Sequence, residues 1–197
     1  MKKLILILFF MLLIPTTFAA GTCATYRDVP EDIWYCPMLT YLQEQNILDS
    51  SKTEFNPNVN LNRAEALKVL FEASGERQGV YTSALFDLDA TAWFTPYFQS
   101  AYAMKYIQSY KGEINPGTDI SKAEFIYLFT RIFEVEMGNS GACGLGVPKL
   151  SGWISDTPGD MHKYLCKAKM LLDIETFDEP VINRATAMAV LYKALKN

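Results

Sequence analysis

The chain has 197 residues, a formal net charge of −4, four cysteines and a single histidine. Half of its residues are hydrophobic, which is enough for one folded domain with a sizeable core. The acidic balance, together with the lack of a basic stripe with interleaved aromatic residues, argues against nucleic acid as a partner.

The N-terminal segment, residues 1–19, has the pattern of a secretory signal peptide. Lys2 and Lys3 form a charged start, an apolar run covers residues 4–14, and residues 17–19 are a small-x-small cleavage signal. Its removal takes two lysines and leaves 16 basic against 22 acidic residues, a net charge of −6. No later stretch reaches about 18 apolar residues, so we expect an exported chain with no transmembrane segment after signal cleavage.

The remainder, residues 20–197, contains a degenerate tetrapeptide three times. It reads Asn-Arg-Ala-Glu at 62–65, Ser-Lys-Ala-Glu at 121–124 and Asn-Arg-Ala-Thr at 183–186, and each copy opens an apolar stretch of helical period. The first two copies are 59 residues apart, and the same offset places Trp34 on Trp93. Such a fixed period predicts one supersecondary unit used repeatedly. We place the three repeats at about 24–75, 84–137 and 152–197.

Each repeat predicts a helix, a loop and a second, more apolar helix. In repeat 1 an extended segment at 26–30 precedes a helix that begins near Pro37 and fades near Asn46. The second helix begins after Asn62 and stops at Gly75, a natural left-handed C-terminal residue. We expect a mainly all-α fold in which the three second helices form a central bundle, with first helices and loops outside.

The tetrapeptide supplies the start of each second helix. Its first residue is the expected N-cap, at Asn62, Ser121 and Asn183. Its last residue completes a capping box at Glu65 and Glu124, whereas Thr186 cannot do so. Capping therefore explains both glutamates, and we expect no enzyme. The alternative is an envelope hydrolase that uses the two glutamates as an acid–base pair.

The four cysteines allow three pairings. Cys23 and Cys36 bracket the start of repeat 1, and Cys143 and Cys166 bracket the corresponding start of repeat 3. We therefore predict the disulfides Cys23–Cys36 and Cys143–Cys166, in keeping with export. Free thiols or a metal site are the alternatives. Zinc is disfavoured because there is no Cys-x-x-Cys pair and the one histidine is His162, so we expect no metal and no cofactor.

The motifs of repeat 1 resemble those of the S-layer homology (SLH) family. Residues 26–30 (Tyr-Arg-Asp-Val-Pro), 34–35 (Trp-Tyr), 55–57 (Phe-Asn-Pro) and 61–65 (Leu-Asn-Arg-Ala-Glu) match the family's entry segment, aromatic pair, loop and second-helix motif in order and spacing. The resemblance implies a three-repeat spindle that binds a bacterial cell-wall glycan, often a pyruvylated secondary polymer, in grooves between repeats. The implied partner is a cell-wall polysaccharide or peptidoglycan-linked polymer, with other envelope proteins as further candidates. The implied location is the cell wall, cell surface or S-layer.

The chain departs from the SLH pattern at several positions. Lys122 replaces the motif arginine in repeat 2, Thr186 replaces the glutamate in repeat 3, and His162 stands near the tryptophan position of repeat 3. The family's glycine-rich loop after the first helix is also missing. These changes leave the identity of the sugar open.

A basic residue occupies the first helical position in all three repeats, as Arg63, Lys122 and Arg184. A cation there opposes the helix dipole and costs up to about 1 kcal/mol, so its recurrence requires a reason. One interpretation is contact with an anionic ligand, and the family's groove arginine carries over to Arg63 and Arg184. The other is an ion pair with a neighbouring repeat, for instance with Asp28, Asp87 or Asp156.

Trp34 and Trp93 are further ligand-binding candidates, because an indole ring can stack on a sugar face. Repeated aromatic residues beside a helix are more often part of the core, and we favour that role here, also for Tyr35 and Phe94. Asp28 is expected to cap the turn that follows it. The sequence thus predicts a non-catalytic envelope module for an anionic glycan. The alternative is a surface protein-interaction scaffold that has lost glycan binding.

Overall fold

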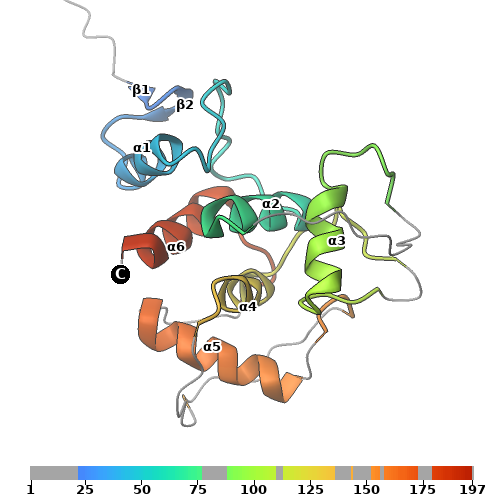
Figure 1. Cartoon of the computed structure of the whole chain (residues 1–197). Coiled ribbons are helices and arrows are strands. Elements are labelled where there is room, and N and C mark those ends of the chain that lie inside the picture. The colour runs from blue at the N-terminus through green and yellow to red at the C-terminus, as the bar shows by residue number, and fades with distance from the viewer. Residues whose placement is uncertain are drawn as a thin grey trace, which may run out of the picture.

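The computed structural model describes residues 22–76, 88–109, 113–135, 143, 152–155, 158–172 and 179–196 (Figure 1). Within these ranges the strands are β1 (Thr22–Cys23) and β2 (Tyr26–Pro30), which form an antiparallel pair. The helices are α1 (Cys36–Glu44), α2 (Arg63–Ser74), α3 (Thr95–Ala103), α4 (Lys122–Ile132), α5 (Pro158–Leu172) and α6 (Arg184–Lys196). The mainly all-α fold expected from the sequence is confirmed. The predicted signal peptide lies outside the described residues.

The first helices of repeats 1 and 2 begin and end alike. Both α1 and α3 carry a proline in the first turn, where the missing N–H is not needed. Each is followed, two residues after its end, by a residue in the left-handed conformation, Asn46 after α1 and Lys105 after α3, both with φ of 58°. The next N–H groups return to the carbonyls of Leu42 and Ala101, which closes the last turn. Glycine is favoured at such positions, and the chain uses asparagine and lysine instead.

The predicted helix starts of the second helices are confirmed. Both halves of the capping box form in α2 between Asn62 and Glu65, and in α4 between Ser121 and Glu124. In α6 the side chain of Asn183 accepts the N–H of Thr186 at 2.8 Å, so one half of the box remains. Gly75 ends α2 with φ of 69°, as the sequence predicts.

The three segments predicted as repeats interlock in cyclic order. Helix α1 packs on α6, α3 packs on α2, and α5 packs on α4, so each first helix lies on the second helix of another repeat (Figure 1). A ring of three backbone hydrogen bonds joins the residues that precede the N-caps. The Leu61 N–H donates to Ile182 O (2.8 Å), Ile182 N–H to Ile120 O (3.0 Å), and Ile120 N–H to Leu61 O (2.9 Å). The three second helices therefore start from one buried hydrogen-bonded centre.

The core is built around α4. Every residue of α4 except Arg131 is buried, including four in succession from Phe125 to Leu128. Helices α2, α5 and α6 all pack against it. A helix that is buried on nearly every side belongs in an interior, and this one occupies the middle of the fold (Figure 1). The bundle is thus less symmetric than three equal second helices would make it.

None of the described helices is long and apolar enough to cross a bilayer.

Candidate ligand-binding cleft

A cleft of about 560 Å³ opens where the loops of repeat 1 meet α2, α6 and the start of α3. Tyr26 and Phe55 contribute aromatic surface from repeat 1, Arg184 lines the cleft from α6, and Trp93 lines it from repeat 2. Its charged lining residues are balanced: Lys52, Lys68 and Arg184 against Asp49, Glu54 and Glu65. The cleft therefore combines apolar rings with cations that stand beside carboxylates.

Arg184 is held in place at the wall of this cleft. Its Nη2 forms an ion pair with the Glu65 carboxylate, and its Nη1 donates to the Phe55 carbonyl at 3.2 Å. Both side chains of the pair are about one-quarter exposed, 26% and 24%. The second oxygen of Glu65 accepts the Asn62 N–H at 3.2 Å. One carboxylate thus caps α2 and orients a guanidinium from repeat 3.

Arg63 makes a related contact but is buried. Its Nη1 donates to the Ile114 carbonyl at 2.5 Å, and Ile114 follows Phe55 by the 59-residue offset of the repeats. The guanidinium lies 4.5 Å from the ring centroid of Trp153. Arg63 is 7% exposed and Trp153 only 1%. An aromatic side chain that precedes α5 therefore covers this cation.

Lys122 has a third arrangement. Its Nζ lies 2.6 Å from the Glu179 carboxylate, and the side chains are 11% and 48% exposed. Arg184 of repeat 3 pairs with the third helical residue of repeat 1, Glu65. In the same cyclic order the partner of Lys122 would be the third helical residue of α6, which is the uncharged Thr186. Lys122 and Thr186, the two departures within the tetrapeptide, therefore fall at one junction, where Glu179 supplies the carboxylate.

The ion pairs seen for Lys122 and Arg184 join different repeats, but through glutamates rather than the aspartates named from the sequence. Asp28 instead accepts the N–H groups of Phe55 (2.8 Å) and Asn56 (2.6 Å). It fixes a loop 27 residues later, so the expected capping of its own turn is wrong. The bond also holds Phe55 and Asn56 at the cleft wall. Asp87 and Asp156 lie outside the described residues.

Trp34 and Trp93 are exposed, at 62% and 54%, so the favoured core role is wrong for both. Each indole packs edge-on against the next residue, with ring centroids 5.2 Å apart at Tyr35 and 5.4 Å apart at Phe94. Tyr35 and Phe94 turn inward and pack against the core. Trp93 lines the cleft with Lys68, whose Nζ is 5.7 Å from the ring centroid. Trp34 is not a lining residue of this cleft.

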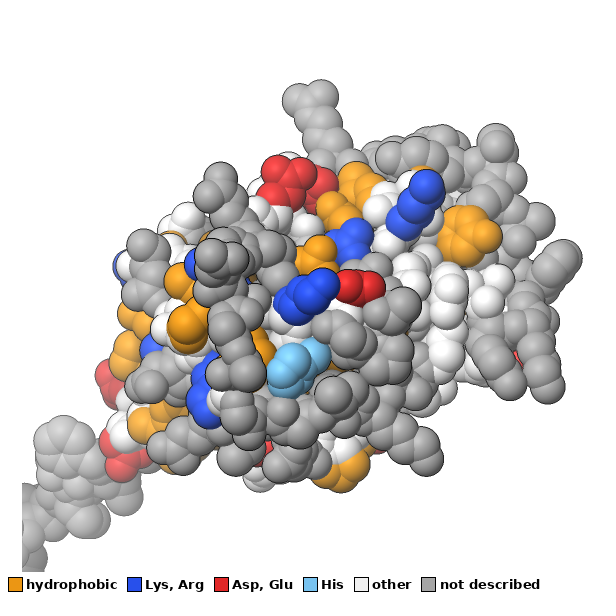
Figure 2. Space-filling view, turned by 90° about the horizontal axis from the view of Figure 1, so that it is seen from below, with side chains coloured by type: hydrophobic (Ala, Val, Ile, Leu, Met, Phe, Trp, Pro, Cys, Tyr) orange, Lys and Arg blue, Asp and Glu red, His pale blue; other side chains and the backbone are white. Residues whose placement is uncertain are grey.

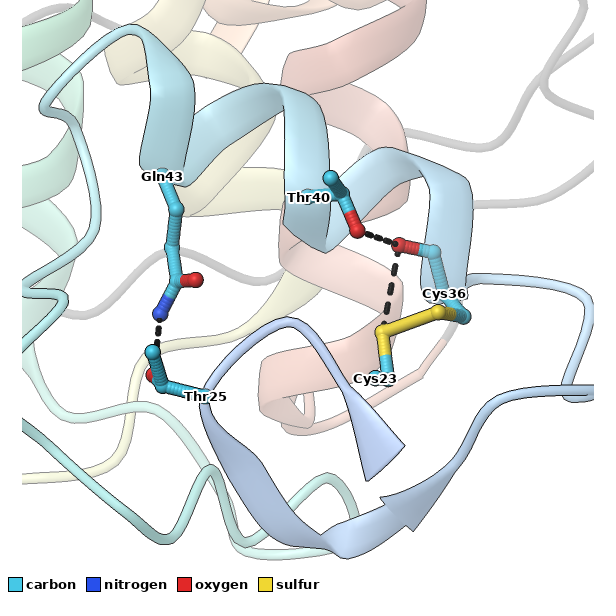
Figure 3. The surroundings of a disulfide bond; sticks show 5 residues. All are labelled: Cys23, Thr25, Cys36, Thr40 and Gln43. Carbon is cyan, nitrogen blue, oxygen red and sulfur yellow. Dashed lines mark hydrogen bonds between the residues drawn. A yellow bond between two sulfur atoms is a disulfide. The ribbon is translucent and has the colours of Figure 1, made fainter. Parts of the chain in front are cut away.

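Both predicted disulfides are present, Cys23–Cys36 and Cys143–Cys166. The first joins β1 to the start of α1 (Figure 3). Beside it Thr40 donates to the Cys36 carbonyl at 3.2 Å, and Gln43 donates to the Thr25 hydroxyl at 2.8 Å (Figure 3). This disulfide therefore fastens the strand pair to the helix that packs on α6.

Sequence reasoning missed three residues around the cationic helix starts: Lys68, Trp153 and Glu179. Lys68 lies on α2 five residues after Arg63, and it is outside the tetrapeptide motif. Trp153 and Glu179 belong to no motif, and their contacts with Arg63 and Lys122 depend on how the repeats dock.

No protein-family model matches the chain. The chain is 32% identical over 117 residues to the "Surface-layer 125 kDa protein" of Lysinibacillus sphaericus. The match covers 55% of this chain and 10% of that protein, so the chain spans only a small part of its curated relative.

Proposed function

We propose that the chain is a non-catalytic module of the bacterial cell surface, built of three SLH repeats, that binds an acidic cell-wall glycan in the Arg184 cleft. The surface-layer relative and the two disulfides support an exported, surface location. Two observations support the repeats. The first two tetrapeptides are 59 residues apart, and Arg184 and Arg63 donate to the carbonyls of Phe55 and Ile114, which are separated by the same offset. The main observation behind the proposal is the cleft, because the exposed Trp93 ring lines it together with the cations Lys68 and Arg184.

The proposed pose places a sugar ring on the exposed face of Trp93. The Lys68 ammonium is close enough to that ring for one sugar to contact both, so a carboxylate substituent on the sugar would meet this cation. Arg184 lies deeper and is already paired with Glu65. A ligand carboxylate can share its guanidinium fork or displace Glu65, and either arrangement gives charge-assisted hydrogen bonds.

The three cationic helix starts are proposed to differ in role. Arg184 borders the cleft, whereas Arg63 lies beneath Trp153 and Lys122 is paired with Glu179. We therefore infer one principal binding groove in this chain, with the other two cations fastening the repeats together.

The test uses purified cell-wall sacculi and the matched tryptophans. Wild-type protein should sediment with walls that retain their accessory polymer and should not sediment with stripped walls. Trp93→Ala should weaken binding at least about tenfold, a loss of roughly 1.4 kcal/mol. Trp34→Ala is the matched control, because Trp34 is at least as exposed as Trp93 and occupies the equivalent position at the 59-residue offset, but does not line the cleft. Equal sedimentation with both kinds of wall would refute the proposal.

The second candidate is a surface scaffold that binds protein rather than sugar. It is favoured by the engagement of Arg63 and Lys122 in contacts between repeats, which leaves fewer cations for a ligand. Calorimetry with a hexose glycoside that carries a cyclic pyruvate ketal separates the two. Saturable binding that Lys68→Gln weakens supports the glycan, and no heat with this ligand or with solubilised wall polymer supports the scaffold.

A further inference from the structure

Three side chains that commonly bind metal ions meet at α5, away from the residues that line the cleft. The sulfurs of Cys143 and Cys166 and a ring nitrogen of His162 all lie within 4.8 Å of one another. The two sulfurs are joined as a disulfide. The His162 Nε2 lies 3.5 Å from the Cys166 sulfur.

The helix dictates part of this arrangement. His162 and Cys166 are four residues apart on α5, so they share one face. Cys166 is buried, whereas Cys143 and His162 are half-buried, which gives the cluster one closed and one open side. Figure 2 shows the histidine, in pale blue, at the surface. Its Nδ1 is buried without a hydrogen-bond partner among the described residues, and a disulfide sulfur offers Nε2 no proton.

The spacing suits a tetrahedral thiophilic cation. Zinc binds thiolate sulfur at about 2.3 Å and imidazole nitrogen at about 2.0–2.1 Å, so tetrahedral ligands of these two kinds stand roughly 3.5 Å apart. The separation of His162 Nε2 and Cys166 Sγ is already 3.5 Å. Once the disulfide is open, rotation of the Cys143 side chain completes a three-ligand set with an open fourth position.

The other disulfide lacks this chemistry. Cys23 and Cys36 are both buried, and the side chains around them in Figure 3 are Thr25, Thr40 and Gln43. Within the described part of the chain no histidine, aspartate or glutamate joins this pair to make a three-ligand group. The two disulfides therefore differ in what their reduced forms can do.

We propose that the reduced form of Cys143 and Cys166, together with His162, binds a thiophilic divalent cation of the Zn²⁺ class. A phosphine reductant and one water convert the disulfide into two thiols and a phosphine oxide. The cation then displaces two protons and forms two metal–sulfur bonds, while a ring nitrogen of His162 donates a lone pair. The metal and the disulfide are thus alternative links between Cys143 and α5. The sequence argument against zinc rested on the lack of a Cys-x-x-Cys pair and on the single histidine, and neither excludes a site whose two cysteines and one histidine meet only in the fold.

The test uses the full chain with Cys23→Ser and Cys36→Ser, so that a single cysteine pair remains. After reduction and removal of the phosphine under argon, Co²⁺ is titrated as a spectroscopic probe and Zn²⁺ as its competitor. One equivalent should give the near-ultraviolet thiolate charge-transfer band and the visible bands of tetrahedral cobalt, and the oxidised protein should give neither. His162→Ala should weaken binding at least tenfold.

The matched control carries Cys143→Ser and Cys166→Ser and keeps Cys23, Cys36 and His162. Control binding as tight as that of the test variant, or full affinity in His162→Ala, would overturn the proposal. Circular dichroism accompanies each titration. If the reduced chain loses helix, one equivalent of Zn²⁺ must restore it, and failure to do so also counts against the site. Wall binding plays no part in these readouts, so the result is independent of the proposed glycan function.

Discussion

The three cationic helix starts should differ in what they contribute to stability, and alanine substitution of each measures this. If Arg63, Lys122 and Arg184 only contacted a ligand, their removal would leave stability unchanged or slightly higher, because a cation leaves the positive end of the helix dipole. The contacts between repeats predict the opposite. We expect destabilisation in the order Arg63→Ala, then Arg184→Ala, then Lys122→Ala.

The magnitudes follow from burial. Arg63→Ala removes a buried cation–π contact with Trp153, worth about 0.5–2 kcal/mol, and a charge-assisted hydrogen bond, worth about 1.5–3 kcal/mol. A net loss of about 3 kcal/mol lowers the melting temperature by roughly 6–12 °C in a domain of this size. Arg184→Ala breaks a partly exposed pair and should cost about 1.5–2 kcal/mol. Lys122→Ala should cost about 0.5–1 kcal/mol, because half of Glu179 is in solvent.

Urea unfolding measured in parallel with wall sedimentation checks the order. Arg27→Ala is the control, since Arg27 is an exposed arginine of β2 and its removal should change stability by less than about 0.5 kcal/mol. Folded Arg63→Ala should bind walls like the wild type, whereas folded Arg184→Ala should bind more weakly. Wild-type stability in Arg63→Ala would refute the burial argument.

Three further predictions concern the loops and junctions. Lys105→Gly should raise the free energy of unfolding by about 0.5–1 kcal/mol in urea, because Lys105 holds a left-handed conformation that glycine adopts without strain. Burial, and to a lesser extent the nearby Glu134 carboxylate, raises the pKa of Glu76. Ionisation of Glu76 therefore destabilises the folded state as the pH rises above about 4.3, the ordinary pKa of a glutamate. Glu76→Gln should therefore raise the melting temperature at neutral pH, with a gain that vanishes in acid. Finally, Lys122→Arg and Thr186→Glu should each leave the free energy of unfolding unchanged or lower it, whereas the double variant should raise it by forming the pair that Arg184 and Glu65 form. Additive effects in this double-mutant cycle would argue against pairing between positions 122 and 186.

The features predicted correctly from the sequence are local or follow from the repeat offset. A capping box needs only residues three apart, so the starts of α2 and α4 could be read directly. The disulfide pairs followed from the positions of cysteines relative to the repeat starts. Neither inference required knowledge of how the repeats dock.

The features predicted wrongly or missed depend on docking. Trp93 and Phe94 are adjacent aromatic residues just before α3, and the sequence does not show which of them faces the core. In the structure Phe94 packs against the core and Trp93 is exposed. The burial of Arg63 requires Trp153, which belongs to another repeat and to no motif. The central place of α4 likewise emerges only when α2, α5 and α6 are packed around it.

The three cationic helix starts are similar in sequence but have different surroundings. A cation at the first helical position is electrostatically unfavourable unless a partner offsets it, so each copy must retain some partner. Repeat 1 offers Glu65 to Arg184 and leaves the cleft beside it open, with an exposed indole at the edge. Once Trp153 covers one cation and Glu179 pairs with another, those two positions stabilise the domain whether or not a ligand binds. Under the proposed glycan-binding function, the Arg184 cleft carries the ligand contacts, and the other two junctions can vary in sequence as long as their cations stay paired.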